Sequence, residues 1–166
     1  MPARKRKPLV AVLDWKPAPA SNDGVEIEKQ ILGKTARAKY FLISTEADLT
    51  SEALNADAII LWQNTKVTER VMAKMVNCRV FVRNGVGYDT VDINAAARLS
   101  IPVCNVPDYG TEEVADHAIA LAMAQVRQLF PLNQEAKQLG WKLHIKDKLR
   151  RLSTLTFCIV GLGRIG

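Results

Sequence analysis

The chain has few of the residues that build metal sites and disulfide frameworks. It contains three cysteines and two histidines among 166 residues. Cys78, Cys104 and Cys158 have no metal-type spacing, and each adjoins an apolar run, so we expect buried, reduced thiols. His117 and His144 stand apart from any cluster of cysteines or carboxylates that a metal site requires. The sequence therefore predicts neither a metal nor a disulfide.

Long apolar runs are also lacking, although the overall composition is ordinary. No run approaches the roughly 20 residues that a membrane helix needs. The basic N-terminus lacks the apolar stretch of a secretory signal. Hydrophobic residues make up 48% of the chain and charged residues 24%, which is typical of a globular protein in solution. We expect a cytoplasmic protein without membrane contact.

Negative charge is in deficit, because 23 Lys and Arg stand against 17 Asp and Glu and give a net charge of +6. Part of the excess is the run Arg4, Lys5, Arg6 and Lys7. We interpret residues 1–7 as a solvated basic tail, which is also compatible with nuclear import. Aromatic residues account for only 6% of the chain, and the sequence has no zinc motif or helix-turn-helix pattern. Nucleic-acid binding is therefore not expected.

Apolar runs of strand length alternate with amphipathic segments between residues 8 and 106. Predicted strands cover residues 8–14, 38–44, 58–62, 79–82 and 102–105, and predicted helices cover residues 24–32, 49–55, 68–76 and 92–99. The first strand is apolar without alternation, as is typical of a central parallel strand buried on both faces. This order predicts an α/β fold with a doubly wound parallel sheet.

The pattern breaks after Val106, and we place a domain boundary there, so that residues 107–166 form a separate part. Thr111 with acidic residues after it predicts the cap of a helix. Apolar positions at helical spacing extend this helix to about Phe130. A less regular stretch follows, and a predicted strand then begins near Thr156.

One stretch with candidate chemistry follows the fourth predicted strand and reads Arg83-Asn84-Gly85-Val86-Gly87-Tyr88. In open α/β sheets, ligands bind at the carboxyl ends of the strands. The glycines around Val86 leave backbone N–H groups open to an anion, and the Arg83 guanidinium suits a carboxylate. A tight strand-to-helix turn is the alternative explanation. We interpret Asp89 and Asp92 as caps of the next helix.

The second stretch is Gly161-Leu-Gly163-Arg164-Ile165-Gly166, directly after the predicted strand that contains residues 157–160. A strand running into G-x-G-x-x-G is typical of a Rossmann unit that binds a dinucleotide pyrophosphate. The helix and the acidic residue that complete such a unit would lie beyond Gly166. We therefore expect the chain to be the N-terminal part of a longer, NAD-dependent enzyme.

Three stretches resemble the D-isomer-specific 2-hydroxyacid dehydrogenases in order and spacing: residues 84–92, 101–117 and 152–166. The resemblance is greatest to the subgroup that includes the C-terminal-binding-protein corepressors. It implies a flavodoxin-like substrate domain over residues 8–106, plus the first helix and strand of a Rossmann domain that is truncated here. The active site of the family lies in the cleft between its two domains.

The resemblance also implies roles for individual residues. It implies that the backbone of Val86 and Gly87 clamps the substrate carboxylate, with Arg83 and Tyr88 beside it. The implied cofactor contacts are Thr111, Gly161, Gly163, Arg164, Ile165 and Gly166. NAD is the implied cofactor, with NADP as an alternative. The catalytic arginine, glutamate and histidine of the family lie downstream of the glycine motif, so no catalytic residue is expected here, and neither histidine of this chain matches.

The implied function is that of the N-terminal portion of an NAD(H)-dependent oxidoreductase that interconverts D-2-hydroxy acids and 2-oxo acids, inactive as this chain alone. The implied partners are a small 2-oxo or 2-hydroxy acid and a second copy of the chain, bound through residues 111–130. An NAD(H)-sensing, corepressor-like binding protein is the alternative. A phosphoacceptor receiver domain shares the sheet type, but it needs an aspartate where this chain has Leu61-Trp-Gln-Asn64.

Overall fold

The computed structural model describes residues 6–15, 25–139 and 149–166. Its internal contacts divide the chain into two compact units, Met1–Tyr109 and Gly110–Gly166. The division falls close to the boundary predicted after Val106. Among the described helices, none is long and apolar enough to cross a membrane.

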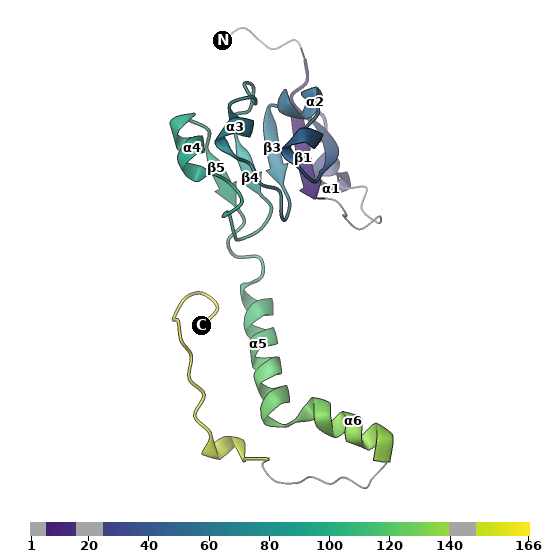
Figure 1. Ribbon diagram of the computed structural model, residues 1–166, viewed down its shortest axis with the longest axis vertical. Coiled ribbons are helices and arrows are strands. Elements are labelled where there is room, and N and C mark those ends of the chain that lie inside the picture. Colours follow the sequence, from purple (N-terminus) through teal and green to yellow (C-terminus); the bar gives the residue numbers. More distant parts are fainter. Residues whose placement is uncertain (1–5, 16–24, 140–148) are drawn as a thin grey trace. The chain divides into compact units, whose positions relative to one another are not determined.

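The first unit is built on a five-stranded parallel sheet with the order β2-β1-β3-β4-β5 (Figure 1). The strands are β1 Leu9–Trp15, β2 Arg37–Ile43, β3 Ala58–Leu61, β4 Phe81–Arg83 and β5 Val103–Asn105. The helices between them are α1 Glu26–Leu32, α2 Ser51–Leu54, α3 Glu69–Met72 and α4 Ile93–Arg98, with the short 3-10 helix η1 at Glu46–Asp48. This is the strand order of flavodoxin-like sheets, and it confirms the predicted fold class.

The main core lies on one face of the sheet. Alternate strand residues, including Leu13 of β1, Ile59 of β3 and Phe81 of β4, are fully buried there. The helices α2, α3 and α4 supply small or apolar side chains to the same cluster, namely Ala53, Val71, Met72, Ala95 and Ala96. The strand β1 lies between β2 and β3, and its successive residues from Leu9 to Leu13, which face opposite sides of the sheet, are all buried, as predicted.

The opposite face of the sheet becomes more exposed toward β5. Val12, Ile60, Val82 and Cys104 are successive neighbours across this face. Val12 is fully buried, Ile60 and Val82 are half-buried, and Cys104 is exposed. Cys104 and Cys158 are exposed free thiols, so the prediction of buried cysteines is right only for Cys78. Burial raises the pKa of the Cys78 thiol.

The basic N-terminal run joins the amino-terminal edge of the sheet through Arg6. Its guanidinium forms an ion pair with Asp57 at 3.0 Å, and Asp57 is only 7% exposed. The same carboxylate accepts the backbone N–H of Leu9 at 2.8 Å. Lys7 donates to the carbonyl of Gly33 at 3.3 Å. Arg6 and Lys7 therefore belong to the folded unit and not to a solvated tail, because a buried carboxylate requires a partner.

The second unit contains α5 Thr111–Val126, α6 Leu129–Leu139 and the short 3-10 helix η2 Leu152–Thr154. Two predictions for it are wrong in detail. Gly110 and not Thr111 is the N-cap of α5. The helix ends at Val126, because Gln128 has a positive φ of 50°, and the chain bends there into α6 (Figure 1). The turn predicted at Gly140 lies outside the described residues.

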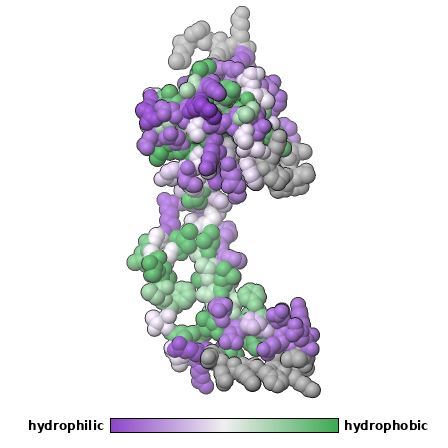
Figure 2. All heavy atoms as spheres, in the orientation of Figure 1, coloured by the Kyte–Doolittle hydropathy of each residue, from purple (hydrophilic) through white to green (hydrophobic). Residues whose placement is uncertain are grey.

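The predicted strand before the glycine motif is absent. Residues 155–160 pair with no strand among the described residues. Phe157 is 68% exposed and Val160 is 98% exposed. A parallel strand is defined by its hydrogen-bonded neighbours, so an apolar run without a neighbour stays outside any sheet. Figure 2 shows apolar side chains gathered over this second unit, mainly along α5.

Predicted apolar faces of two helices are also more exposed than expected. Ile27 and Ile31 of α1 are 69% and 78% exposed, and α1 has no buried residue. In the segment after α3, Met75 is buried, but Val76 is 79% exposed. The predicted N-cap of α1, Asp23, lies outside the described residues, and Gly33 ends the helix with a φ of 51°, as its position predicts.

Candidate functional site

The loop that follows β4 is held on both sides by the neighbouring strands. The N–H of Asn84 donates to the carbonyl of Leu61 in β3 at 2.8 Å. The N–H of Val106, directly after β5, donates to the carbonyl of Gly85 at 3.0 Å. The loop therefore continues the sheet at its carboxyl edge, where the sequence predicts a ligand site.

Arg83 is the last residue of β4, and its guanidinium folds against this loop. The Nη1 group donates to the carbonyl of Asn84, and Nε is buried without a hydrogen-bond partner among the described residues. Gly85 makes this position possible. A Cβ atom there would lie 2.2 Å from Nη1, and the φ of 152° disfavours other residues. The Arg83 charge thus lies beside the backbone of Asn84 and Gly85.

Val86 and Gly87 present two successive backbone N–H groups. No described residue accepts a hydrogen bond from either group. The carbonyl groups of the same two peptide units are hydrogen-bonded. Asn105 Nδ2 donates to the carbonyl of Val86 at 2.8 Å, and the N–H of Val106 donates to the carbonyl of Gly85. Two successive N–H groups without an acceptor can donate hydrogen bonds to an anion.

The loop ends at the N-cap of α4. Asp92 accepts the N–H of Ala95 at 2.9 Å and begins α4, which confirms its predicted role. Asp89 makes no such bond. Its Oδ1 lies 3.1 Å from the position that a Cβ of Gly87 would take. The loop therefore has the Arg83 guanidinium close to Gly85 and the Asp89 carboxylate close to Gly87.

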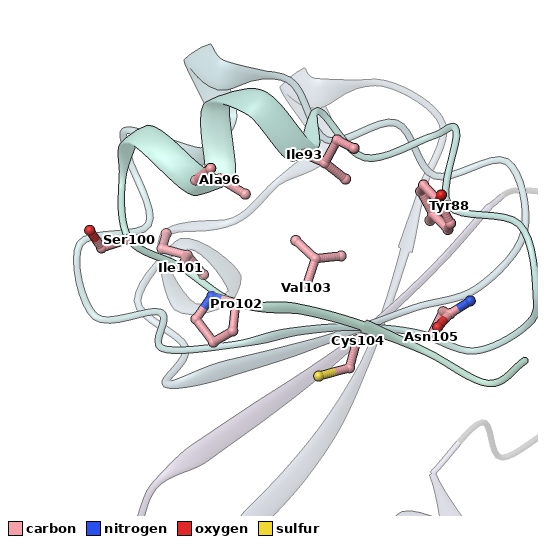
Figure 3. A pocket seen from close by; sticks show the side chains of 10 residues that line it. Tyr88, Ile93, Ala96, Ser100, Ile101, Pro102, Val103, Cys104 and Asn105 are labelled. Carbon is pink, nitrogen blue, oxygen red and sulfur yellow. The ribbon is translucent and has the colours of Figure 1, made fainter.

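Tyr88 is one of the residues that line a hollow between α4 and β5. The hollow encloses about 620 Å³ and has no charged residue among those that line it. Figure 3 shows Val103 pointing into it from β5, with Ile93 and Ala96 opposite and Cys104 pointing away. Tyr88 is 50% exposed, so its ring is available to a ligand bound at the loop.

A second hollow of about 390 Å³ lies where the strand order reverses. It is lined by residues at or after the carboxyl ends of β1, β2 and β3, among them Trp15, Ser44 and Lys66. Glu46 lies at its rim, where the Thr68 hydroxyl and then the Arg70 guanidinium bind the carboxylate and lower its pKa. The free N–H groups of Val86 and Gly87 are not part of this hollow.

The predicted cofactor residues lie in the second unit. Gly161 has a φ of 115°, which glycine adopts readily. A Cβ on Gly166 would lie 2.1 Å from the Gly161 carbonyl oxygen, whereas no described atom lies within 4 Å of a Cβ on Gly163. Arg164 and Ile165 are exposed in the same loop, and Thr111 is the first residue of α5.

The predicted substrate residues therefore lie at the end of β4, in the case of Arg83, and in the loop after it, in the case of Val86, Gly87 and Tyr88. His117 is exposed on α5, and His144 lies outside the described residues. No metal-binding group of three or more His, Cys, Asp or Glu is present in the part of the chain that the structure describes. Sequence reasoning missed Asn105. Its place at the carboxyl end of the neighbouring strand is the signal that would have found it.

Comparison with known proteins gives consistent matches. Residues 10–157 match the family described as D-isomer specific 2-hydroxyacid dehydrogenase, catalytic domain. The chain is 33% identical to D-3-phosphoglycerate dehydrogenase of Synechocystis sp. over 86% of its own length and 25% of that protein. It is 35% identical to the enzyme of the same name from Archaeoglobus fulgidus, over 72% of this chain and 22% of that protein.

Solved structures agree with these matches. D-lactate dehydrogenase from Aquifex aeolicus, complexed with NAD and lactic acid, matches with a TM-score of 0.74 and 24% identity, over 95% of this chain and 45% of that chain. NADPH-dependent glyoxylate/hydroxypyruvate reductase from Sinorhizobium meliloti, in complex with NADP and malonate, matches with a TM-score of 0.67 and 28% identity, over 97% and 48%. The chain thus spans about a quarter of the curated relatives and just under half of these solved chains.

Proposed function

The chain belongs to the D-isomer specific 2-hydroxyacid dehydrogenase family, and from this premise we propose that it supplies the carboxylate-binding domain and part of the cofactor-binding domain of an NAD(H)-dependent oxidoreductase. The substrates are small 2-oxo acids and D-2-hydroxy acids. The observation that carries the proposal is the pair of free N–H groups of Val86 and Gly87, in the same loop whose residues Asn84 and Gly85 the Arg83 guanidinium contacts.

The substrate carboxylate binds to these two N–H groups. Arg83 supplies a positive charge that is already desolvated on one side, because its Nε is buried. Each charge-assisted hydrogen bond is stronger than a neutral one. Tyr88, half-exposed beside the clamp, contacts the part of the substrate beyond the carboxylate. Asp89 disfavours dianions next to the clamp, because its own carboxylate lies close to Gly87.

The glycine loop fits the pyrophosphate of a dinucleotide. Gly161 and Gly166 are required by the conformation of the loop itself, whereas no contact with the described residues requires Gly163. Its lack of a side chain is explained by the close approach of a phosphate to the backbone. Thr111, Arg164 and Ile165 are the other proposed contacts. NAD(H) supplies the hydride when bound. NADP is the alternative, since one of the two solved relatives contains NAD and the other contains NADP.

No residue of this chain is assigned a catalytic proton transfer. His117 is exposed on α5 in the second unit. The resemblance to the corepressor subgroup stays a prediction. We also propose that α5 forms a homodimer contact, supported by its exposed apolar side chains Val114, Ile119 and Leu121.

Titration of the ¹⁵N-labelled chain with pyruvate tests the proposal. We expect the amide signals of Val86 and Gly87 to shift, with a dissociation constant in the millimolar range. Replacing Arg83 by Ala removes a charged hydrogen-bond donor and should weaken binding about tenfold or more. Pyruvamide, which has the same shape but no charge, is the matched control ligand.

Two results would refute the proposal. If the amide signals of Val86 and Gly87 do not shift with pyruvate, these N–H groups do not bind the carboxylate. Equal shifts with pyruvamide would show that the carboxylate charge is not recognised. We also expect no oxidation of NADH by pyruvate with this chain alone, followed at 340 nm, because no general acid is assigned to it.

A further inference from the structure

We propose that Asn105 is a positioning residue that turns the two N–H groups of the carboxylate clamp toward the substrate. This inference rests on the proposed function, because it concerns the same loop. Among the described residues, one side-chain hydrogen bond reaches the clamp backbone of Val86 and Gly87, from Asn105 Nδ2 to the carbonyl of Val86 at 2.8 Å.

A trans peptide unit points its C=O and its N–H in opposite directions. The carbonyl of Val86 is tied to Asn105, so the N–H of Gly87, in the same peptide unit, points away from β5. The carbonyl of Gly85 is tied to the N–H of Val106 at 3.0 Å, so the N–H of Val86 also points away from β5. Two consecutive donors therefore face the same side of the loop.

The hydrogen bonds from Val106 and from Asn105 depend on different parts of the chain. The Val106 anchor is a backbone bond, and no side chain decides it. The Asn105 anchor depends on one side chain at the end of β5, where Asn105 is paired with Arg83 of β4. The peptide between Val86 and Gly87 lacks other support, because both residues are exposed and Gly87 has no side chain to restrict rotation. Asn105 thus selects one orientation of this peptide.

Loss of this bond allows the Val86–Gly87 peptide to rotate, so that a carbonyl oxygen faces the substrate carboxylate in part of the population. Repulsion between the two oxygens then opposes binding. Asn105 itself acts only through the peptide. A carboxylate in its place repels the Val86 carbonyl, whereas a protonated carboxyl group again donates a hydrogen bond to it.

The test uses Asn105→Asp and Asn105→Ala in the chain as it exists, with pyruvate titrations followed at the Gly87 and Val86 amides. At pH 7 we expect Asn105→Asp to bind about tenfold more weakly and Asn105→Ala severalfold more weakly. Lowering the pH to about 4 protonates part of the new carboxyl groups, so the defect of Asn105→Asp should shrink, while that of Asn105→Ala should not. Asn94→Asp, an exposed position on α4, controls for the added charge.

A merely structural role for Asn105 would lower the resistance to urea without changing the affinity of the folded chain or its pH profile. Equal affinity of wild type and both variants would overturn the inference while the proposed function stands. If the wild type does not bind pyruvate, the proposed function fails. The residual dipolar coupling of the Gly87 N–H then still decides the positioning role, since it must change in Asn105→Ala if Asn105 sets the peptide orientation.

Discussion

Replacement of Asp57 by Ala should destabilise the first unit more than any change at its partner Arg6. The Asp57 side chain is 8% exposed, whereas that of Arg6 is 48% exposed. Asp57 accepts the buried N–H of Leu9 at 2.8 Å and the Arg6 guanidinium at 3.0 Å. It therefore joins the start of β1 to the start of β3 at the amino edge of the sheet.

The magnitudes follow from burial. Asp57→Ala leaves the N–H of Leu9 buried without its acceptor and removes a charge-assisted bond, which together cost about 2–4 kcal/mol of unfolding free energy. Asp57→Asn keeps an acceptor oxygen for Leu9 and should cost about half as much. Arg6→Ala removes a half-exposed partner, so its cost should be about 0.5–1 kcal/mol.

Urea unfolding followed by tryptophan fluorescence measures these differences. A Trp141→Phe background leaves Trp15 and Trp62, both in the first unit, as the reporters. With a slope of about 2 kcal/mol per molar urea, Asp57→Ala should lower the midpoint by about 1–2 M. Lys34→Ala, an exposed cation with no hydrogen bond recorded, controls for the loss of positive charge at Arg6.

Two outcomes would refute this reasoning. A cost below about 1 kcal/mol for Asp57→Ala would mean that the N–H of Leu9 finds water or another acceptor. Equal costs for Arg6→Ala and Asp57→Ala would place the stabilisation in the exposed ion pair, contrary to the weak coupling of exposed charges. High salt should reduce the effect of Arg6→Ala and leave that of Asp57→Ala nearly unchanged.

Two further predictions concern Glu46 and α5. Thr68→Val removes the hydrogen bond that contributes most to the lowered pKa of Glu46, so the pKa should rise but stay below its ordinary value because Arg70 remains; a ¹³C titration showing no rise would contradict this. A carboxyl group whose pKa is lower in the folded than in the unfolded state stabilises the fold at pH values above its unfolded pKa. This stabilisation is lost as the pH falls through the folded pKa, so the variant, which has less of it, should lose less stability in acid. Ile119→Glu should abolish a homodimer through α5 in light scattering, and a wild-type monomer at high concentration would refute that contact.

The predictions that succeeded rest on local chemistry. The apolar run of β1 has no alternation, and its burial on both faces followed from that alone. Asp92 was identified as a cap because a short carboxylate before a helix has a free N–H within reach. The loop from Arg83 to Tyr88 was placed correctly at the carboxyl edge, since it directly follows a predicted strand of a parallel sheet.

The predictions that failed concern what each residue finds as a neighbour. The run from Phe157 to Val160 has the composition of a strand, but the described residues provide no strand to pair with it. Gln128 adopts a positive φ that divides one predicted helix into α5 and α6. Arg6 looked like part of a solvated tail, because its buried partner Asp57 is 51 residues away in sequence.

The sequence by itself determined the alternation of strands and helices, the class of sheet and the loop that presents Val86 and Gly87, because these depend on periodicity and on the backbone freedom of glycine. Only the tertiary structure decided the strand order, the burial of Asp57 and the bond from Asn105 to Val86. Those features join residues from separate strands, and which strands become neighbours depends on how the whole sheet buries its apolar faces.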